Sequence, residues 1–196
     1  MTEDLMGIQG LLDLLYGWSP YSATFRKCLI GILSAQHTQA REVLCARGTQ
    51  VRAAWYSVDA WVLLWRPMEN GEGEVARIYG PGEILTEPGG FFGGGPAQGE
   101  LSVIQGSRLL RISRTDFAQL KKFAETFDLA QGYMLAEREM ETWRLGLLAL
   151  HEGERLAAFA LRYPLSSLPA VACASFLRMT PSRFSAARAS YLRTHR

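Results

Sequence analysis

Apolar positions in the first part of the chain recur every three or four residues, which is typical of amphipathic helices. They are Ile8, Leu11, Leu12 and Leu15, followed by Phe25, Cys28, Leu29 and Ile32. This spacing predicts one or two helices over residues 8–35. A proline disfavours helical geometry in the residue before it, so we expect a break at Trp18-Ser19-Pro20.

The pattern changes between about residues 42 and 112, where short apolar runs such as WVLLW and LSVI alternate with turn signals. The turn signals are Arg47-Gly48, Asn70-Gly71-Glu72-Gly73, Gly80-Pro81-Gly82 and the glycine- and proline-rich residues 88–99. Short strands at roughly 8–15-residue spacing are typical of antiparallel barrels and rolls. We therefore expect an antiparallel β-roll here.

Residues 115–150 lack proline and contain one glycine before Gly146, which predicts a long helix of about 30 residues in one or more segments. Its predicted apolar stripe is Phe123, Phe127, Ala130, Met134, Trp143 and Leu147. Such a face must cover the β-roll or a second subunit. We expect it to form a homodimer, the alternative being a helix that packs wholly within its own chain.

The C-terminal segment predicts three shorter helices, over residues 153–163, 168–177 and 181–193. Thr180 is a favourable N-cap for the last helix, and Pro181 suits its first position. Two short helices joined by a turn of three to four residues, the second of them rich in arginine, are typical of a helix-turn-helix motif.

The net charge of +2 conceals an asymmetry along the 196 residues. The last 42 residues contain no acidic residue and seven arginines, so they carry +7 and the first 154 residues carry −5. The seven are Arg155, Arg162, Arg178, Arg183, Arg188, Arg193 and Arg196. Because the arginine fork suits phosphates and base edges, a nucleic-acid contact is expected at this end of the chain.

Several classes of protein are disfavoured by the same composition. No apolar run approaches the roughly 18 residues of a membrane span, and the acidic start MTEDLMGIQG does not resemble a signal peptide. The three cysteines are far apart and include no CxxC pair. These cysteines favour a reducing cytoplasm, and 48% apolar and 20% charged residues are typical of a globular protein.

Three segments resemble the Crp/Fnr family of transcription regulators, and the resemblance covers about residues 22–193. YGPGEILTE (79–87) is similar to a family segment ending in Gly-Asp-x-x-Gly-Glu, with Thr86 in place of the second glycine. GERLAAFAL (153–161) resembles the helix that follows the family's dimerisation helix. CASFLRMTPSRFSAAR (173–188) resembles its DNA-binding motif.

The resemblance implies an α+β fold: a cyclic-nucleotide-binding-like β-roll with flanking helices, a long dimerisation helix and a C-terminal all-α helix-turn-helix domain. The corresponding divisions are residues 1–118, 119–150 and 151–196. The implied partners are double-stranded DNA, a second copy of the chain, a small-molecule effector and RNA polymerase. The implied function is regulatory, not enzymatic. The segment joining the C-terminal helices is too short for the family's flanking hairpins, so a wingless variant is expected.

The ligand site implied by the resemblance is altered. Glu87 occupies the place of the family's ribose-binding glutamate, but Ala97 stands where an arginine binds the cyclic phosphate. Without that charge-assisted pair, cyclic AMP and cyclic GMP are not expected to bind in the usual way. The amides of Gly93, Gly94 and Gly95 remain candidates to hold an anion, although such a run is more often an ordinary loop. Arg108 is expected to be a surface residue and not a substitute for the missing arginine.

The DNA-binding motif also departs from the family pattern. Arg178 replaces the turn glycine, so a left-handed conformation there would be costly. Ala186 removes one base-contacting arginine. The residues still expected at DNA are Arg178, Thr180, Ser182, Arg183, Ser185, Arg188 and Arg193. Of these, Arg183 is expected near bases, and Arg188 and Arg193 near phosphates.

Other chemistries find less support in the sequence. A metal-dependent β-roll enzyme needs clustered ligands, but His37, His151 and His195 are far apart. A sulfur- or haem-based sensor would depend on Cys45 or His37, each of which is more often structural or solvated. The tryptophans at 55, 61 and 65 are expected in the core, with a ligand pocket as the alternative. A protein-interaction module without DNA binding remains the competing hypothesis for the whole chain.

Overall fold

The computed structural model describes residues 2–68 and 73–194. The predicted turn at Asn70-Gly71-Glu72, and His195 and Arg196, lie outside the described residues. Two antiparallel sheets have the strand orders β1-β8-β3-β6 and β2-β7-β4-β5. The strands are β1 (Ser34–His37), β2 (Val43–Cys45), β3 (Ala53–Ser57), β4 (Trp61–Pro67), β5 (Gly73–Tyr79), β6 (Ile84–Leu85), β7 (Glu100–Gln105) and β8 (Arg108–Ser113). The predicted antiparallel β-roll is confirmed.

The interior of the roll is filled by side chains from both sheets. Val51, Val62, Tyr79, Leu85 and Leu101 are fully buried and belong to one apolar cluster. Strand residues alternate between the two faces of a sheet, so their neighbours point outward. On the outer face of the β1-β8-β3-β6 sheet these neighbours form the base of a second apolar layer, beneath the helices.

The N-terminal helices are α1 (Thr2–Trp18) and α2 (Ala23–Ile32), and they cover that outer face. The predicted break is confirmed, because α1 ends at Trp18, before Ser19-Pro20. Ser22 begins α2, because its hydroxyl accepts a hydrogen bond from the Phe25 amide. The prediction that helix continues to residue 35 is wrong. Leu33 adopts an extended conformation, and Ser34 starts β1, whose hydrogen-bond partner is β8.

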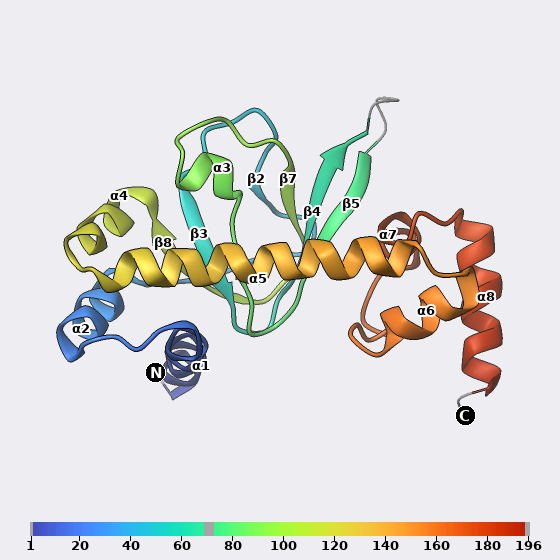
Figure 1. Ribbon diagram of the computed structural model, residues 1–196, viewed down its shortest axis with the longest axis horizontal. Helices are drawn as coiled ribbons and strands as arrows, with labels where there is room; N and C mark the ends of the chain where they lie inside the picture. The colour runs from blue at the N-terminus through green and yellow to red at the C-terminus, as the bar shows by residue number, and fades with distance from the viewer. Residues whose placement is uncertain (1, 69–72, 195–196) are drawn as a thin grey trace.

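The long helix α5 (Glu125–Leu148) is shorter than predicted, and it begins after two smaller segments. These are α4 (Arg114–Phe117) and a 3₁₀ helix, η1 (Ala118–Lys122). Phe123 has extended geometry, and the Thr126 hydroxyl donates a hydrogen bond to the Leu120 carbonyl, which fixes the corner. In Figure 1, α5 runs along the long axis of the molecule across one side of the roll.

The apolar residues of α5 divide between two faces, whereas a single stripe was predicted. Leu129, Tyr133, Met140 and Leu147 are buried against the chain itself. The opposite face carries an outer stripe, which we define as the exposed residues Phe127, Met134, Leu135 and Leu145. Phe127, Met134 and Leu145 are spaced by two and three helical turns, so they share one side of the helix.

Three helices follow α5: α6 (Glu152–Ala160), α7 (Ala170–Phe176) and α8 (Pro181–Thr194). They confirm the three predicted C-terminal helices. Their core is continuous with the roll, because Phe159, Phe176 and Phe184 join one cluster with Val75 and Ile78 of β5. The mixed α+β architecture is therefore as expected.

No helix within residues 2–68 and 73–194 has the length and hydropathy to cross a bilayer.

Candidate functional site

In the segment that resembles a nucleotide-binding cassette, the two key positions, Glu87 and Ala97, are buried and contact other residues of the chain. Glu87 is 2% exposed and precedes the short helix α3 (Pro88–Phe91), and its carboxylate lies 3.8 Å from the Arg66 guanidinium. Ala97 is also 2% exposed, and its amide and carbonyl are bonded to Thr49 and Gly48, both at 2.9 Å. A buried methyl group thus stands at the position expected of a phosphate-binding arginine.

The glycine run does not present a set of free amides. The Gly93 amide donates to the Gly89 carbonyl at 3.1 Å, and the Gly94 amide donates to the Gly90 carbonyl at 2.9 Å. Gly94 has a φ of +80°, and a side chain there would meet the Arg114 guanidinium. The suggestion that Gly93, Gly94 and Gly95 jointly cradle an anion is wrong for the first two, since their amides are already used within a tight turn.

Arg108 is held by a carboxylate of the roll, and the two candidate sensor ligands, Cys45 and His37, lie in different environments. The Asp59 carboxylate accepts hydrogen bonds from the Arg108 amide at 2.8 Å and from its guanidinium at 2.7 and 2.9 Å. Cys45 is buried, and burial raises the pKa of its thiol, whereas His37 is exposed on β1. Among the described residues, no group of three or more His, Cys, Asp and Glu side chains is placed to hold a metal ion.

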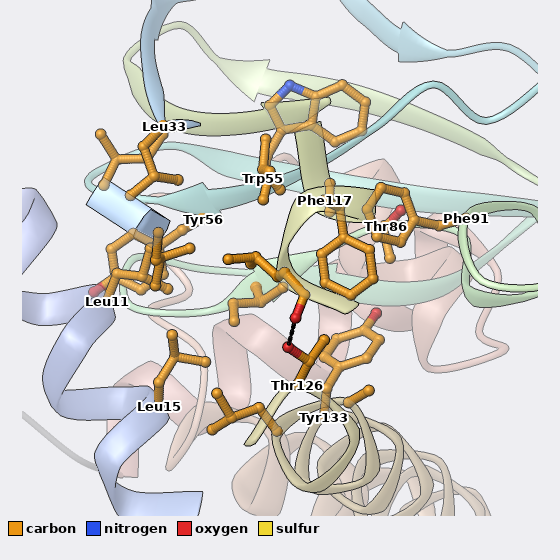
Figure 2. A pocket seen from close by; sticks show the side chains of 18 of the residues that line it. Leu11, Leu15, Leu33, Trp55, Tyr56, Thr86, Phe91, Phe117, Thr126 and Tyr133 are labelled. Atoms are coloured by element: carbon orange, nitrogen blue, oxygen red, sulfur yellow. Dashed lines mark hydrogen bonds between the residues drawn. The ribbon is translucent and has the colours of Figure 1, made fainter. Parts of the chain in front are cut away.

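An apolar pocket of about 100 Å³ lies between the outer face of the β1-β8-β3-β6 sheet and the helices that cover it. Leu11 and Leu15 of α1, Tyr56 of β3, and Phe117 at the end of α4 form parts of its wall (Figure 2). Tyr133 closes it from α5. Residues 120–133 adjoin the apolar pocket from the side of the sheet that the helices cover.

A buried polar cluster adjoins the apolar pocket, and its only signal in the sequence is one arginine in the apolar run VARIY. Arg77 of β5 binds Glu83 at 2.8 Å and Glu137 of α5 at 3.4 Å. The Tyr79 hydroxyl donates to Glu137 at 3.0 Å. Burial raises the pKa of Glu137, and the Arg77 guanidinium opposes this shift. The cluster joins the roll to the long helix.

Glu74 of β5 links the roll to the turn between α7 and α8. Its carboxylate accepts hydrogen bonds from Arg178 at 2.9 and 3.1 Å and from Arg144 of α5 at 3.2 Å. The Ser175 hydroxyl of α7 accepts from the amide of Val75 at 2.9 Å. Arg178, expected at DNA, is thus held by a carboxylate of its own chain.

Arg178 adopts the conformation that was expected to be costly, with a φ of +51°. Its amide donates to the Ser175 carbonyl, and the Met179 amide donates to the Ala174 carbonyl. This is the Schellman arrangement in which glycine is usual at the position of Arg178. The two hydrogen bonds to Glu74 offset the strain that a non-glycine residue brings to the turn.

Helix α8 has one face in the core and one in solvent. Phe184 is 1% exposed, while Ser182, Arg183, Ser185, Ala186 and Arg193 are exposed. Thr180 caps the helix as predicted, because its hydroxyl accepts from the Arg183 amide at 3.3 Å. The exposed face is thus made mostly of small side chains, together with Arg183 and Arg193.

The remaining arginines of α8 differ in their environments. Arg183 forms a 3.1 Å ion pair with Glu152 of α6, in which both side chains are largely in solvent. Arg188 is half-buried, and it opposes the burial that raises the pKa of Cys173 to about 11. The predicted phosphate contact therefore has clear access to solvent at Arg193 and less at Arg188.

Replacing Glu74 with glutamine is expected to lower the free energy of unfolding by about 1–2 kcal/mol, because charge-assisted hydrogen bonds disappear. The Arg178 hydrogen bonds, aided by Arg144, hold the pKa of Glu74 below its ordinary 4.5. The ionised carboxylate therefore stabilises the fold fully above about pH 4.5, and this contribution disappears as the pH falls through the lower folded-state pKa. Urea unfolding between pH 7 and pH 3 measures the effect.

The control is Glu139→Gln, which removes the same charge from an exposed position on α5. The difference between wild type and Glu74→Gln should be constant near neutrality and shrink in acid. A difference that persists at pH 3 would show that Glu74 does not act through its ionised form.

Comparison with known proteins supports the fold. Residues 35–122 match the family model of the cyclic nucleotide-binding domain. FixK2 from Bradyrhizobium japonicum has a TM-score of 0.69 and 15% identity, covering 84% of this chain and 86% of FixK2. No curated protein sequence matches the chain.

Two further solved structures share this architecture. One is the c-di-GMP responsive global regulator CLP from Xanthomonas campestris, with a TM-score of 0.64, 14% identity, and coverage of 89% of this chain and 93% of CLP. The other is the Thermus thermophilus catabolite activator protein, with a TM-score of 0.55, 17% identity, and coverage of 93% and 88%. Residues 35–122 are thus similar in sequence to cyclic nucleotide-binding domains, and the chain shares its fold with these three solved structures.

Proposed function

We propose that the protein is a homodimeric transcription regulator of Crp/Fnr type that binds double-stranded DNA through α8. The observation that supports this most strongly is the exposed face of α8, in an acid-free segment that carries seven arginines. Small side chains such as Ser182, Ser185 and Ala186 let a helix approach the floor of the major groove closely. The proposed divisions remain sensor 1–118, connecting helix 119–150 and DNA-binding domain 151–196.

The outer stripe of α5 supports the proposed dimer. Phe127, Met134, Leu135 and Leu145 are 74%, 46%, 52% and 63% exposed in the single chain. Seven residues separate Phe127 from Met134, as in the seam of a coiled coil. A second α5 laid against this stripe would remove the apolar residues from water and give the two copies of α8 a fixed separation.

The sensor domain is proposed to bias the dimer between two arrangements of its helices, as an allosteric regulator does. The buried methyl of Ala97 and the paired amides of Gly93 and Gly94 argue that its effector is not a cyclic nucleotide bound in the usual way. The function is regulatory, not enzymatic, and is proposed for the cytoplasm. We also propose that the protein contacts RNA polymerase where it acts as an activator.

A fluorescent promoter fragment from beside the protein's own gene tests DNA binding. Anisotropy titrations at two salt concentrations should show affinity that falls steeply as salt rises, because bound arginines release counterions from phosphates. Absence of salt-dependent, sequence-preferring binding would support the competing hypothesis, an interaction module without DNA binding. Two observations favour this interaction module: Arg178 is paired with Glu74 of its own chain, and Arg188 is half-buried.

Two arginine substitutions should separate backbone contacts from base contacts. Arg193→Ala is expected to weaken binding to all sequences alike and to reduce the salt slope by about 1, since one arginine no longer neutralises a phosphate. Arg183→Ala is expected to cost about 1–3 kcal/mol on the preferred sequence and to relax the preference at one base pair. The same titrations measure both.

The matched control is Arg47→Ala, which removes one exposed arginine from the sensor domain. It should leave both affinity and slope close to wild type. If all three substitutions weakened binding equally, net charge would account for the interaction and α8 would have no special role.

A further inference from the structure

A basic groove lies where β3 begins and β8 passes into α4. Its volume is about 470 Å³, and its wall includes Arg52, Arg111 and Arg114, with the uncharged polar residues Gln50 and Thr115 beside them. No acidic side chain of the described residues lines it. The first 154 residues carry a net charge of −5, so the three arginines are a local concentration of positive charge in an acidic part of the chain.

The backbone holds the three arginines together. Where the β3–β8 ladder ends, the Arg114 amide donates to the Arg52 carbonyl at 2.8 Å, so these two residues lie opposite each other. Arg111 is paired with Trp55 in the same ladder, and paired residues project from the same face of a sheet. Like charges at neighbouring positions of adjacent strands destabilise a sheet, so this arrangement has a cost unless a counterion is present.

The three guanidinium groups have no partner of their own. Arg111 and Arg114 are half-buried and Arg52 is exposed, and none of them makes a side-chain hydrogen bond or ion pair within residues 2–68 and 73–194. The nearby Asp116 does not line the basic groove, and its carboxylate accepts a hydrogen bond from the Ser113 hydroxyl at 2.5 Å. A half-buried guanidinium has five N–H donors, which lose part of their hydration without gaining an acceptor.

Other arginines of similar burial are satisfied within the chain. Arg77, Arg108 and Arg144 each form an ion pair with a carboxylate, at 2.8, 2.7 and 3.2 Å. The chain therefore supplies acceptors for its half-buried arginines elsewhere and does not do so in the basic groove. This contrast indicates that the missing acceptor is an anion from outside the chain.

We propose that the basic groove binds the phosphate monoester of a small molecule. A phosphate monoester carries a charge of about −1.5 to −2 at pH 7 and has three acceptor oxygens, which three arginines can contact at once. Sulfate esters and cyclic phosphodiesters carry one charge and suit the groove less well. The groove is also separate from the altered nucleotide cassette, because neither Glu87 nor Ala97 lines it.

This site would act on the segment that leads into the long helix. Arg111 belongs to β8 and Arg114 begins α4, which η1 and α5 follow. In Figure 1, α4 and α8 lie at opposite ends of α5, so the groove is remote from the proposed DNA contact. A bound phosphate ester would favour one position of the start of α5 and hence one arrangement of the dimer. This last step rests on the proposed function, whereas binding itself does not and is measured without DNA.

The experiment is calorimetric titration of the full chain with phenyl phosphate in low-salt buffer at neutral pH. Phenyl sulfate has nearly the same shape and one charge, and it should bind at least about 10-fold more weakly. Cyclic AMP should also bind more weakly than phenyl phosphate. Absence of saturable binding at low-millimolar phenyl phosphate would overturn the proposal, and so would equal affinity for phenyl sulfate.

Two variants test whether the arginines of the groove bind the phosphate. Arg111→Gln and Arg114→Gln should each weaken phenyl phosphate binding by about 10- to 100-fold, because a charge-assisted contact is lost. Arg26→Gln is the matched control, since it removes one exposed arginine from α2, and it should bind as wild type. Equal weakening in all three variants would show a general effect of net charge and overturn the proposal.

Thermal unfolding without ligand separates binding from a structural role. Both groove variants should unfold at the wild-type temperature or above it, because the repulsion between neighbouring arginines is reduced. Phenyl phosphate should raise the unfolding temperature of wild type more than that of either variant. A lower unfolding temperature for both variants without ligand would show that the arginines stabilise the chain itself. A short DNA duplex that displaced phenyl phosphate would assign the groove to nucleic acid. Either result would contradict the proposal.

Discussion

Replacing Phe127 and Leu145 with glutamate is expected to convert the proposed dimer into single chains. Both side chains belong to the outer stripe of α5 and are 74% and 63% exposed in one chain. Each unpaired charge that an apolar interface buries costs about 3–5 kcal/mol, and two substitutions in each of two protomers introduce four charges. We expect the dissociation constant of the dimer to rise by at least about 1000-fold, measured by sedimentation velocity over a range of protein concentrations.

The fold of each chain should survive this double substitution, because exposed positions usually change stability by no more than about 0.5 kcal/mol. Leu161→Glu is the matched control, since Leu161 is 87% exposed and lies at the end of α6, away from the outer stripe. It should sediment as wild type. A double variant that remained dimeric at micromolar concentration would place the interface elsewhere.

Replacing Phe159 with alanine is expected to lower the free energy of unfolding by about 3–5 kcal/mol. Phe159 is 0% exposed, and its ring lies 5.0 Å from that of Tyr163 and 5.6 Å from that of Phe176. Its cluster includes Val75 and Ile78 of β5, so the cavity would weaken the packing of the C-terminal helices against the roll as well as the helices themselves.

Because the C-terminal helices share an apolar cluster with Val75 and Ile78 of the roll, we expect the helices and the roll to unfold in a single transition, in both wild type and Phe159→Ala. Calorimetry and circular dichroism during urea titration measure the transition and its midpoint. Phe25→Ala, an equal truncation in the separate cluster beneath α1 and α2, is the control and should cost a similar amount. A separate early transition of α6–α8, with the roll unchanged, would contradict the shared core.

Local signals in the sequence were sufficient for most elements of the fold. The proline after Trp18 and the Thr180-Pro181 pair mark helix ends through geometry that depends on a few adjacent residues. β1 was missed because Ser34–His37 becomes a strand only by pairing with β8, some 70 residues later. The apolar stripe of α5 was misassigned because periodicity identifies apolar positions and not the partner that each one contacts.

The candidate sites were harder to predict for the same reason. Glu74 and Arg178 are 104 residues apart, and nothing near either residue indicates that they meet. Arg178 in place of a glycine was recognised as a departure, but its compensation by Glu74 depends on the packing of α7 against β5. The apolar pocket is lined by helices and strands from across the first 133 residues, so only the assembled fold reveals it.

In the proposed regulator, two copies of α8 contact DNA from one symmetric dimer. Selection of binding sites from a pool of random DNA duplexes tests this directly, without knowledge of the natural target. We predict that wild-type protein enriches inverted repeats whose half-site centres are about 10 to 10.5 base pairs apart, or a multiple of this spacing, and that the Phe127→Glu, Leu145→Glu variant does not. Enrichment of no sequence, or of single half-sites by both proteins alike, would contradict it.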